Sequence, residues 1–170
     1  FVLDQGYETE SLWQGPAGLW LKKEKRRLPL YWENREGEYF FRDFETWKKV
    51  SEYASLPCHF INWYEAQAYC QWANRRLPSE WEWQLAASVE KPSKTPTLSV
   101  KYGREEKLKQ GESYFGCRQM LGNIWEWTDS THFPLEGYLV DQIYPEYSAT
   151  SFGYHKILKG GSWASGSDFV

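Results

Sequence analysis

The spacing of apolar and polar residues predicts a helix in the middle of the chain, in the stretch NWYEAQAYCQWANR. Four small or aromatic residues recur there at intervals of three and four, as on the buried face of an amphipathic helix: Ala66, Tyr69, Cys70 and Ala73. Asn62 is a favourable N-cap residue, and Glu65, three positions later, completes a variant of the capping box. We therefore expect a helix that begins after Asn62 and ends near Asn74.

A second helix is expected directly afterwards, because the same capping pattern is repeated. Ser79 is the N-cap residue and Glu82 lies three positions further along. The stretch EWEWQLAAS then carries the helix to Ser88. Pro78 disfavours a helical conformation for the residue before it, so an extended segment should separate the two helices.

The first 50 residues mix aromatic and charged positions without a helical period, and we expect short strands or turns there. The sequences PLYW and YFF suit the two strands of a hairpin, with the turn at EGEY, residues 36–39. The basic run KKEKRR, residues 22–27, is expected to be a solvated loop.

The second half of the chain alternates between loops and short core strands. Residues 89–113 are polar and contain two prolines, which predicts a long loop or an insertion. GNIWEW and HKILKGGSW are expected to be core strands. Between them lies an aromatic loop, residues 130–155, and a loop of this length usually has a function.

The composition indicates an aromatic and amphipathic core, because 19% of the residues are aromatic while the mean hydropathy is −0.73. The net charge of −3 gives no electrostatic footprint for nucleic acid, and no apolar run is long enough to span a membrane. Three cysteines without CxxC spacing argue against a disulfide framework or a structural zinc site, and they favour a cytoplasmic location. The chain begins abruptly without Met, so we expect it to be partial at both ends.

Four blocks of sequence together resemble the formylglycine-generating enzyme family, also known as the sulfatase-modifying factor family. They occur in the family's order: the WYEA helix, RLPSEWEW, GNIWEW and KGGSW, in which Lys159 replaces the usual Arg. The resemblance implies an α+β, C-type-lectin-like fold with little regular secondary structure. It covers about residues 55–165, and the combination is far more specific than any single block.

The branch of the family that uses copper is disfavoured. Its members carry two cysteines just after the GGS[WY] block, whereas here Trp163 is followed by Ala164 and Ser165, with no Cys up to Val170. Thiolates are the soft ligands that copper(I) requires, and a hydroxyl group does not replace them.

The sequences FVLDQGYETESLW, PLYWE and PEYSATSFGYHKILKGGSW are similar to the C-terminal domain of the ergothioneine-type sulfoxide synthases. These non-haem Fe(II) enzymes use O₂ to join a thiol, glutamylcysteine or cysteine, to Nα-trimethylhistidine, and relatives make selenoneine or ovothiol precursors. The resemblance implies that residues 1–170 are one partial domain. The iron ligands would lie on a four-helix, DinB-like N-terminal domain that is absent from this chain, so the piece alone would be inactive. The alternative is a non-catalytic module of the same fold that binds through the 130–155 loop.

Asn123 and Glu126 are polar residues in an otherwise aromatic block, and two interpretations remain open. In the first, which we favour, they are buried hydrogen-bonding groups: Glu126 caps a backbone turn and Asn123 fixes a bend after Gly122. In the second, they bind a structural Ca²⁺ together with backbone carbonyls. Calcium needs six to eight oxygen ligands, and these two side chains supply only part of such a set.

The 130–155 loop holds the tyrosines that the resemblance implicates in catalysis. In sulfoxide synthases a loop tyrosine reaches the iron site and donates a proton or hydrogen. Tyr138, after Gly137, is the first candidate and Tyr144 the second, whereas Tyr147 is expected to be packing. The three histidines are expected to be structural or on the surface: His59, His132 and His155.

Overall fold

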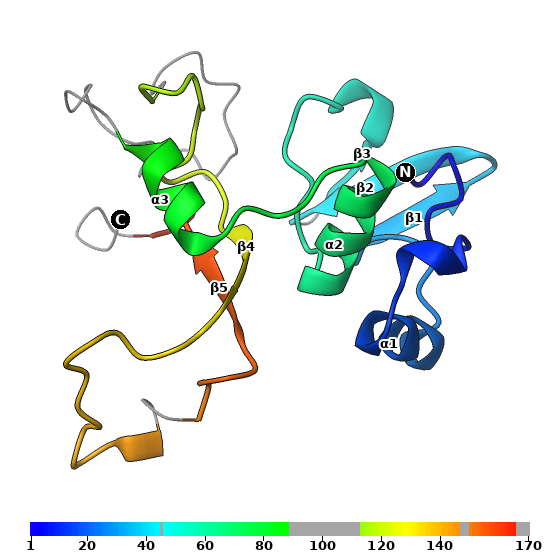
Figure 1. Cartoon of the computed structure of the whole chain (residues 1–170). Helices are drawn as coiled ribbons and strands as arrows, with labels where there is room; N and C mark the ends of the chain where they lie inside the picture. Colours follow the sequence, from blue (N-terminus) through cyan, green and yellow to red (C-terminus); the bar gives the residue numbers. More distant parts are fainter. Residues whose placement is uncertain (45, 89–112, 147–149, 166–170) are drawn as a thin grey trace. The chain divides into compact units, whose positions relative to one another are not determined.

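A computed structural model describes residues 1–44, 46–88, 113–146 and 150–165 (Figure 1). The chain divides into two compact units, one formed by the described residues up to Arg76 and the other by those from Leu77 onward. The 89–113 insertion, apart from Ser113, and Tyr147 lie outside the described residues.

The first unit contains a three-stranded antiparallel sheet of order β1-β2-β3, formed by β1 (Trp32–Arg35), β2 (Glu38–Asp43) and β3 (Thr46–Lys49). In β1 and β2, Trp32 faces Phe41 across a tight turn at Glu36 and Gly37, which confirms the predicted hairpin. Strand β3 falls within the first 50 residues, where short strands or turns were expected. Two short 3-10 helices, η1 (Glu10–Leu12) and η2 (Val50–Glu52), also belong to this unit.

Helix α1 (Pro16–Glu24) corrects the expectation of strands or turns in the first 50 residues. It begins with proline at the first helical position, where the missing N–H costs nothing, and apart from Gly18 it consists mostly of good helix formers. It ends at Lys25, which adopts the left-handed conformation. The basic run is therefore partly helical, although most of its side chains are exposed as expected.

Helix α2 (Trp63–Trp72) confirms the first predicted helix and its cap. Asn62 accepts a hydrogen bond from the backbone N–H of Glu65, and the Glu65 carboxylate accepts one from the backbone N–H of Asn62. Its predicted buried face is right at Ala66, which is 7% exposed, but wrong at Tyr69, which is 51% exposed, and Ala68 is buried instead, at 1% exposed. The buried side turns toward an aromatic cluster that includes Tyr7, Trp13 and Ala17 as well as Ala68.

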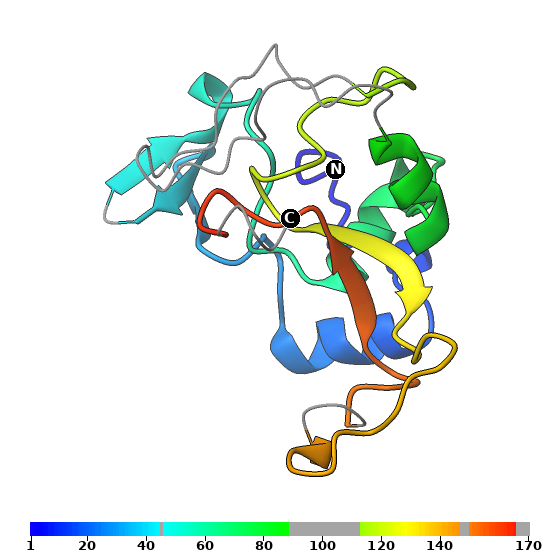
Figure 2. The ribbon, with the colours of Figure 1, turned by 90° about the vertical axis from the view of Figure 1, so that its left-hand side faces the viewer.

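The second unit contains α3 (Glu80–Ala87), β4 (Glu126–Thr131) and β5 (Lys156–Lys159). Helix α3 begins with the predicted capping box of Ser79 and Glu82. Strands β4 and β5 pair antiparallel and lie side by side in Figure 2, with the loop that joins them extending from one end of the pair. Strand β4 lies further along the chain than the predicted GNIWEW, residues 122–127, and β5 covers only part of the predicted HKILKGGSW, residues 155–163.

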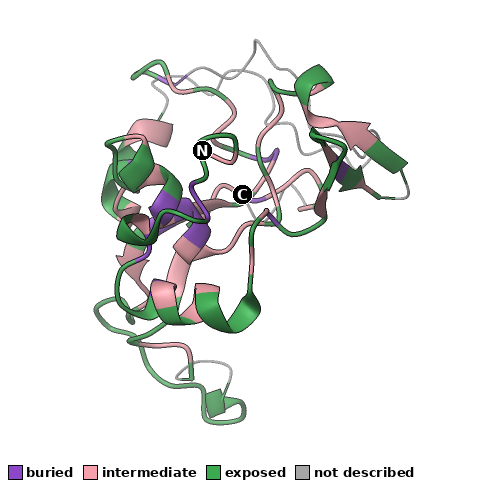
Figure 3. Cartoon of the chain, turned by 90° about the vertical axis from the view of Figure 1, so that its right-hand side faces the viewer, coloured by how far each residue is buried: buried purple, intermediate pink, exposed green. Residues whose placement is uncertain are grey.

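The regular elements are short and few positions are fully buried, as Figure 3 shows. This mixture of helices and small sheets agrees with the expected α+β class with little regular structure. Among the described helices, none is both long and apolar enough to cross a membrane.

Candidate functional site

Backbone hydrogen bonds close the base of the loop between β4 and β5. The backbone N–H of His132 donates to the carbonyl oxygen of His155 at 2.7 Å, and that of Gly153 donates to the carbonyl oxygen of His132 at 2.9 Å. The His132 ring nitrogen Nδ1 lies 2.9 Å from the hydroxyl oxygen of Ser151. The loop therefore has a fixed base that does not depend on the side chains further out.

Tyr138 is held at the side of this loop by an aromatic contact. Its ring packs edge-on against Phe152 at 5.3 Å, and Phe152 also contacts the ring of His132 at 4.9 Å. The residue before it, Gly137, has a φ of +83° in a turn closed by the Tyr138 N–H on Leu135. With 37% of its surface exposed, Tyr138 is supported by neighbours yet reachable from solvent.

Tyr144 has a different environment on the same loop. Its backbone N–H, and that of Ile143, donate to Oδ1 of Asp141 at 2.8 Å. These bonds from backbone N–H groups lower the pKa of the Asp141 carboxyl. The Tyr144 side chain is 57% exposed. The backbone at Tyr144 is thus fixed by Asp141, and its side chain is more exposed than that of Tyr138.

Several large apolar side chains of this loop are exposed to solvent. They are Phe133, Leu135, Leu139, Val140 and Ile143. Together with Tyr138 and Tyr144, they give the loop the exposed apolar character that is typical of binding surfaces.

Glu126 is engaged by a residue far away in the sequence. Its Oε2 accepts a hydrogen bond of 2.6 Å from the indole Nε1 of Trp83 in α3. Burial raises the pKa of the Glu126 carboxyl, and the bond from Trp83 opposes this shift. Glu126 therefore links β4 to α3, in line with the structural interpretation, although its partner is an indole and not a backbone turn.

Asn123 lies in a left-handed bend with a φ of +52°. Its side-chain Nδ2 donates to Oε1 of Gln119 at 3.0 Å, and its carbonyl oxygen accepts from the N–H of Trp163. The side-chain oxygen Oδ1 of Asn123 is buried without a hydrogen-bond partner among the described residues.

A calcium ion requires six to eight oxygen ligands. Asn123 offers one buried oxygen, and the Glu126 carboxyl accepts a hydrogen bond from Trp83, so these two side chains supply only part of such a set. Across residues 1–44, 46–88, 113–146 and 150–165, no group of three or more His, Cys, Asp or Glu side chains is placed to hold a metal. The histidines lie instead against aromatic rings, as with His59 on Phe60 and His155 on Tyr154.

The GNIWEW and KGGSW blocks meet through the backbone. The N–H of Gly122 donates to the carbonyl oxygen of Gly160 at 2.7 Å. Gly160 has a φ of +92°, and a Cβ atom there would lie 2.4 Å from the carbonyl oxygen of Met120. Beside it, Lys159 lies 3.4 Å from Glu80 and 5.7 Å from the ring centre of Trp83. Lys159 thus has an acidic partner in Glu80.

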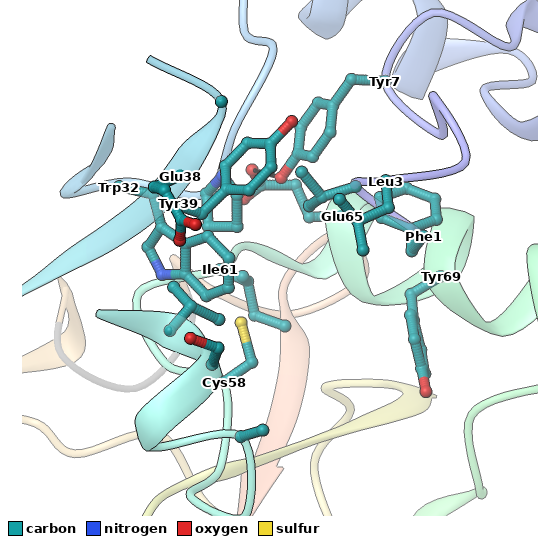
Figure 4. A pocket seen from close by; sticks show the side chains of 16 residues that line it. Phe1, Leu3, Tyr7, Trp32, Glu38, Tyr39, Cys58, Ile61, Glu65 and Tyr69 are labelled. Carbon is teal, nitrogen blue, oxygen red and sulfur yellow. Dashed lines mark hydrogen bonds between the residues drawn. The ribbon is translucent and has the colours of Figure 1, made fainter. Parts of the chain in front are cut away.

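A cavity of about 550 Å³ lies within the first unit (Figure 4). Glu65, which is 4% exposed, lines it and accepts a hydrogen bond of 2.7 Å from the hydroxyl of Tyr7. Burial raises the pKa of the Glu65 carboxyl, although hydrogen bonds from Asn62 and Tyr7 oppose this shift. Most of the wall is apolar, and five aromatic residues contribute to it: Phe1, Tyr7, Trp32, Tyr39 and Tyr69.

Sequence reasoning identified Glu65 only as a capping residue. Its second partner, Tyr7, is 58 positions away, and no local pattern links the two. The same holds for Glu126 and Trp83, which are 43 positions apart. The sequence alone allowed predictions only from patterns of neighbouring residues, namely the capped helices and the aromatic blocks.

The entire chain matches the family described as sulfatase-modifying factor enzyme 1-like domain, in two overlapping segments, residues 1–111 and 92–170. The chain is 32% identical over 186 residues to hercynine oxygenase of Mycobacterium tuberculosis, with 96% of this chain and 42% of that protein aligned. It is 30% identical over 189 residues to hercynine oxygenase of Mycolicibacterium smegmatis, with the same two shares. It is 24% identical over 201 residues to inactive C-alpha-formylglycine-generating enzyme 2 of Mus musculus, with 99% of this chain and 60% of that protein aligned.

The chain thus spans 42% of the length of the two hercynine oxygenases that it resembles, and the matched region includes all four sequence blocks. This confirms the predicted family and its likeness to enzymes of the ergothioneine type. On the match along its whole length, the chain belongs to the sulfatase-modifying factor enzyme 1-like domain family, whose fold is the C-type-lectin-like α+β domain.

Proposed function

We propose that this chain is the C-terminal domain of an Fe(II)- and O₂-dependent sulfoxide synthase that acts on hercynine, which is Nα-trimethylhistidine. The observation that carries the proposal is the likeness to two hercynine oxygenases along 96% of this chain. The thiol donor would be glutamylcysteine or cysteine. In the overall reaction, a thiol S–H, an imidazole C–H and O₂ give a C–S bond, one S=O group and one water.

The iron ligands would lie on a DinB-like N-terminal domain outside these 170 residues. Iron would supply the activation of O₂, and the described residues of this chain do not offer a site for it. The role proposed for this chain is to form part of the wall of the substrate cavity. The protein would work in the cytoplasm, as its cysteine usage indicates.

Within this proposal, Tyr138 holds a proton at its phenolic oxygen for the reacting centre. Its contact with Phe152 and the turn at Gly137 support this choice, because a proton donor must be held in place to act. Tyr144 is the second candidate, on a more exposed part of the loop.

Turnover by the full-length protein tests the proposal. Hercynine is supplied with Fe(II), O₂ and each thiol in turn, and the sulfoxide is measured by mass spectrometry. Tyr138→Phe should lower the rate of sulfoxide formation about 100-fold, as expected for loss of a general acid. Tyr144→Phe removes the same hydroxyl from the same loop and tests the second candidate, because a loss of rate in that variant with an unchanged rate in Tyr138→Phe would make Tyr144 the proton donor. Equal rates for wild type and Tyr138→Phe would remove Tyr138 from the mechanism.

Two alternatives use the same assay. A selenoneine or ovothiol-type synthase would make its product only with a selenol donor or with a different thiol and histidine derivative. A non-catalytic binding module of the same fold would turn over none of them. Two observations support the binding module. The name of the mouse relative calls that protein inactive, and the loop of this chain exposes apolar side chains.

A further inference from the structure

We infer that the cavity of the first unit binds a protonated amine that carries an apolar body. The inference rests on the charge, the open hydrogen-bonding positions and the walls of this cavity. Its volume of about 550 Å³ lies within the range of small-molecule sites.

The charge of the cavity is negative. Glu65 and Glu38 both line it, and no Lys, Arg or His side chain is among the described residues that do so. Glu38 already has a cation, because its carboxylate lies 2.8 Å from the ammonium group of Lys49. Glu65 is the more deeply buried of the two, and the cation whose charge reaches it, Arg26, is not part of the wall. A positively charged ligand would therefore complement Glu65.

The Glu65 carboxylate can accept more hydrogen bonds than it has in the structure. Its Oε1 accepts from the hydroxyl of Tyr7 and its Oε2 accepts from the backbone N–H of Asn62. Two carboxylate oxygens offer about four lone-pair positions, so about two remain for a ligand. A protonated amine carries N–H donors for them, whereas a quaternary ammonium group carries none.

The walls select the rest of the ligand. In Figure 4 the rings of Tyr7, Tyr39 and Trp32 stand around the cavity, and the side chain of Ile61 lies beside them. Aromatic faces attract cations and also bury apolar groups. The ligand class is therefore an amine whose ammonium group meets Glu65 and whose aliphatic or aromatic body contacts these side chains.

Calorimetric titration of the full-length protein with 4-phenylbutylamine, without Fe(II) or hercynine, tests the inference. We expect saturable binding, at least about 10-fold tighter than that of the neutral analogue 4-phenylbutanol, as a charge-assisted hydrogen bond implies. The N,N,N-trimethyl derivative of the amine should also bind at least about 10-fold more weakly. No binding of the amine, or equal binding of either analogue, would overturn the inference.

Two capping residues give a matched pair of variants. Glu65→Gln and Glu82→Gln make the same change at the same position of a capping box, and only Glu65 lines the cavity. Glu65→Gln should weaken amine binding about 10-fold or more, and Glu82→Gln should not. Equal affinities for the two variants would contradict the inference. Because these titrations involve no turnover, their outcome is independent of whether the protein makes a sulfoxide.

Discussion

Replacing Gly160 by alanine tests how the two blocks GNIWEW and KGGSW are joined. At a φ of +92°, any side chain is strained, by about 1–2 kcal/mol on the scale of left-handed conformations. The new Cβ atom would also lie 2.4 Å from the carbonyl oxygen of Met120 and 3.1 Å from the ring of Trp83. The first neighbour is backbone, so it cannot simply rotate away, and such overpacking costs about 1–3 kcal/mol. Alanine also lowers the conformational entropy of the unfolded chain, which reduces the loss of stability by about 0.4–1 kcal/mol. The net expectation is a loss of about 2–4 kcal/mol.

Gly153→Ala is the matched control for this experiment. Gly153 has a nearly equal φ of +88° in the same unit, but the nearest atom to its Cβ would be a Phe133 ring carbon at 3.9 Å, an ordinary contact. Its expected loss is therefore only about 1 kcal/mol, the strain less the effect on the unfolded chain. Urea unfolding followed by tryptophan fluorescence measures both variants. If Gly160→Ala loses no more stability than Gly153→Ala, the close approach to Met120 does not constrain this position.

Three further predictions concern hydrogen bonds of single side chains. Burial raises the folded-state pKa of Glu126, so the stability contributed by its protonated carboxyl is complete below the unfolded pKa and is lost as the pH rises through the folded pKa. Glu126→Gln should therefore gain stability relative to wild type as the pH rises from about 4 in urea titrations, and a constant difference would contradict this. Ser79→Ala removes the N-cap acceptor of α3 and should cost about 1 kcal/mol in the same assay, whereas no loss would mean that the cap contributes little. Tyr7→Phe deprives the buried Glu65 carboxylate of a donor and should cost about 1–3 kcal/mol, and a neutral effect would show that water replaces the hydroxyl.

The sequence predicted the parts of the fold that depend on neighbouring residues. Both capping boxes lie within four positions, so Asn62 and Ser79 located the starts of α2 and α3 correctly. Helix α1 was missed because Gly15 provides no side-chain cap and the charged run obscured the period. The proline that opens α1, at position 16, was the available signal.

The candidate sites depend on contacts that no local pattern contains. Tyr69 fits the helical period of α2 as well as Ala68 does, and only the aromatic cluster around Trp13 decides which of them is buried. The partner of Glu126 is likewise a tertiary contact with Trp83. The loop tyrosines could be named from the resemblance, but the support that Phe152 gives to Tyr138 required the structure.

The main-chain bonds between His132, Gly153 and His155 have a consequence for how this domain can diversify. These hydrogen bonds join backbone atoms. Side chains elsewhere in the loop can therefore change without weakening the pairing of β4 and β5. The entropic cost of closing a longer loop also grows only slowly with its length. Loops of different length and side-chain chemistry can therefore join β4 and β5 while the strand pair itself stays unchanged.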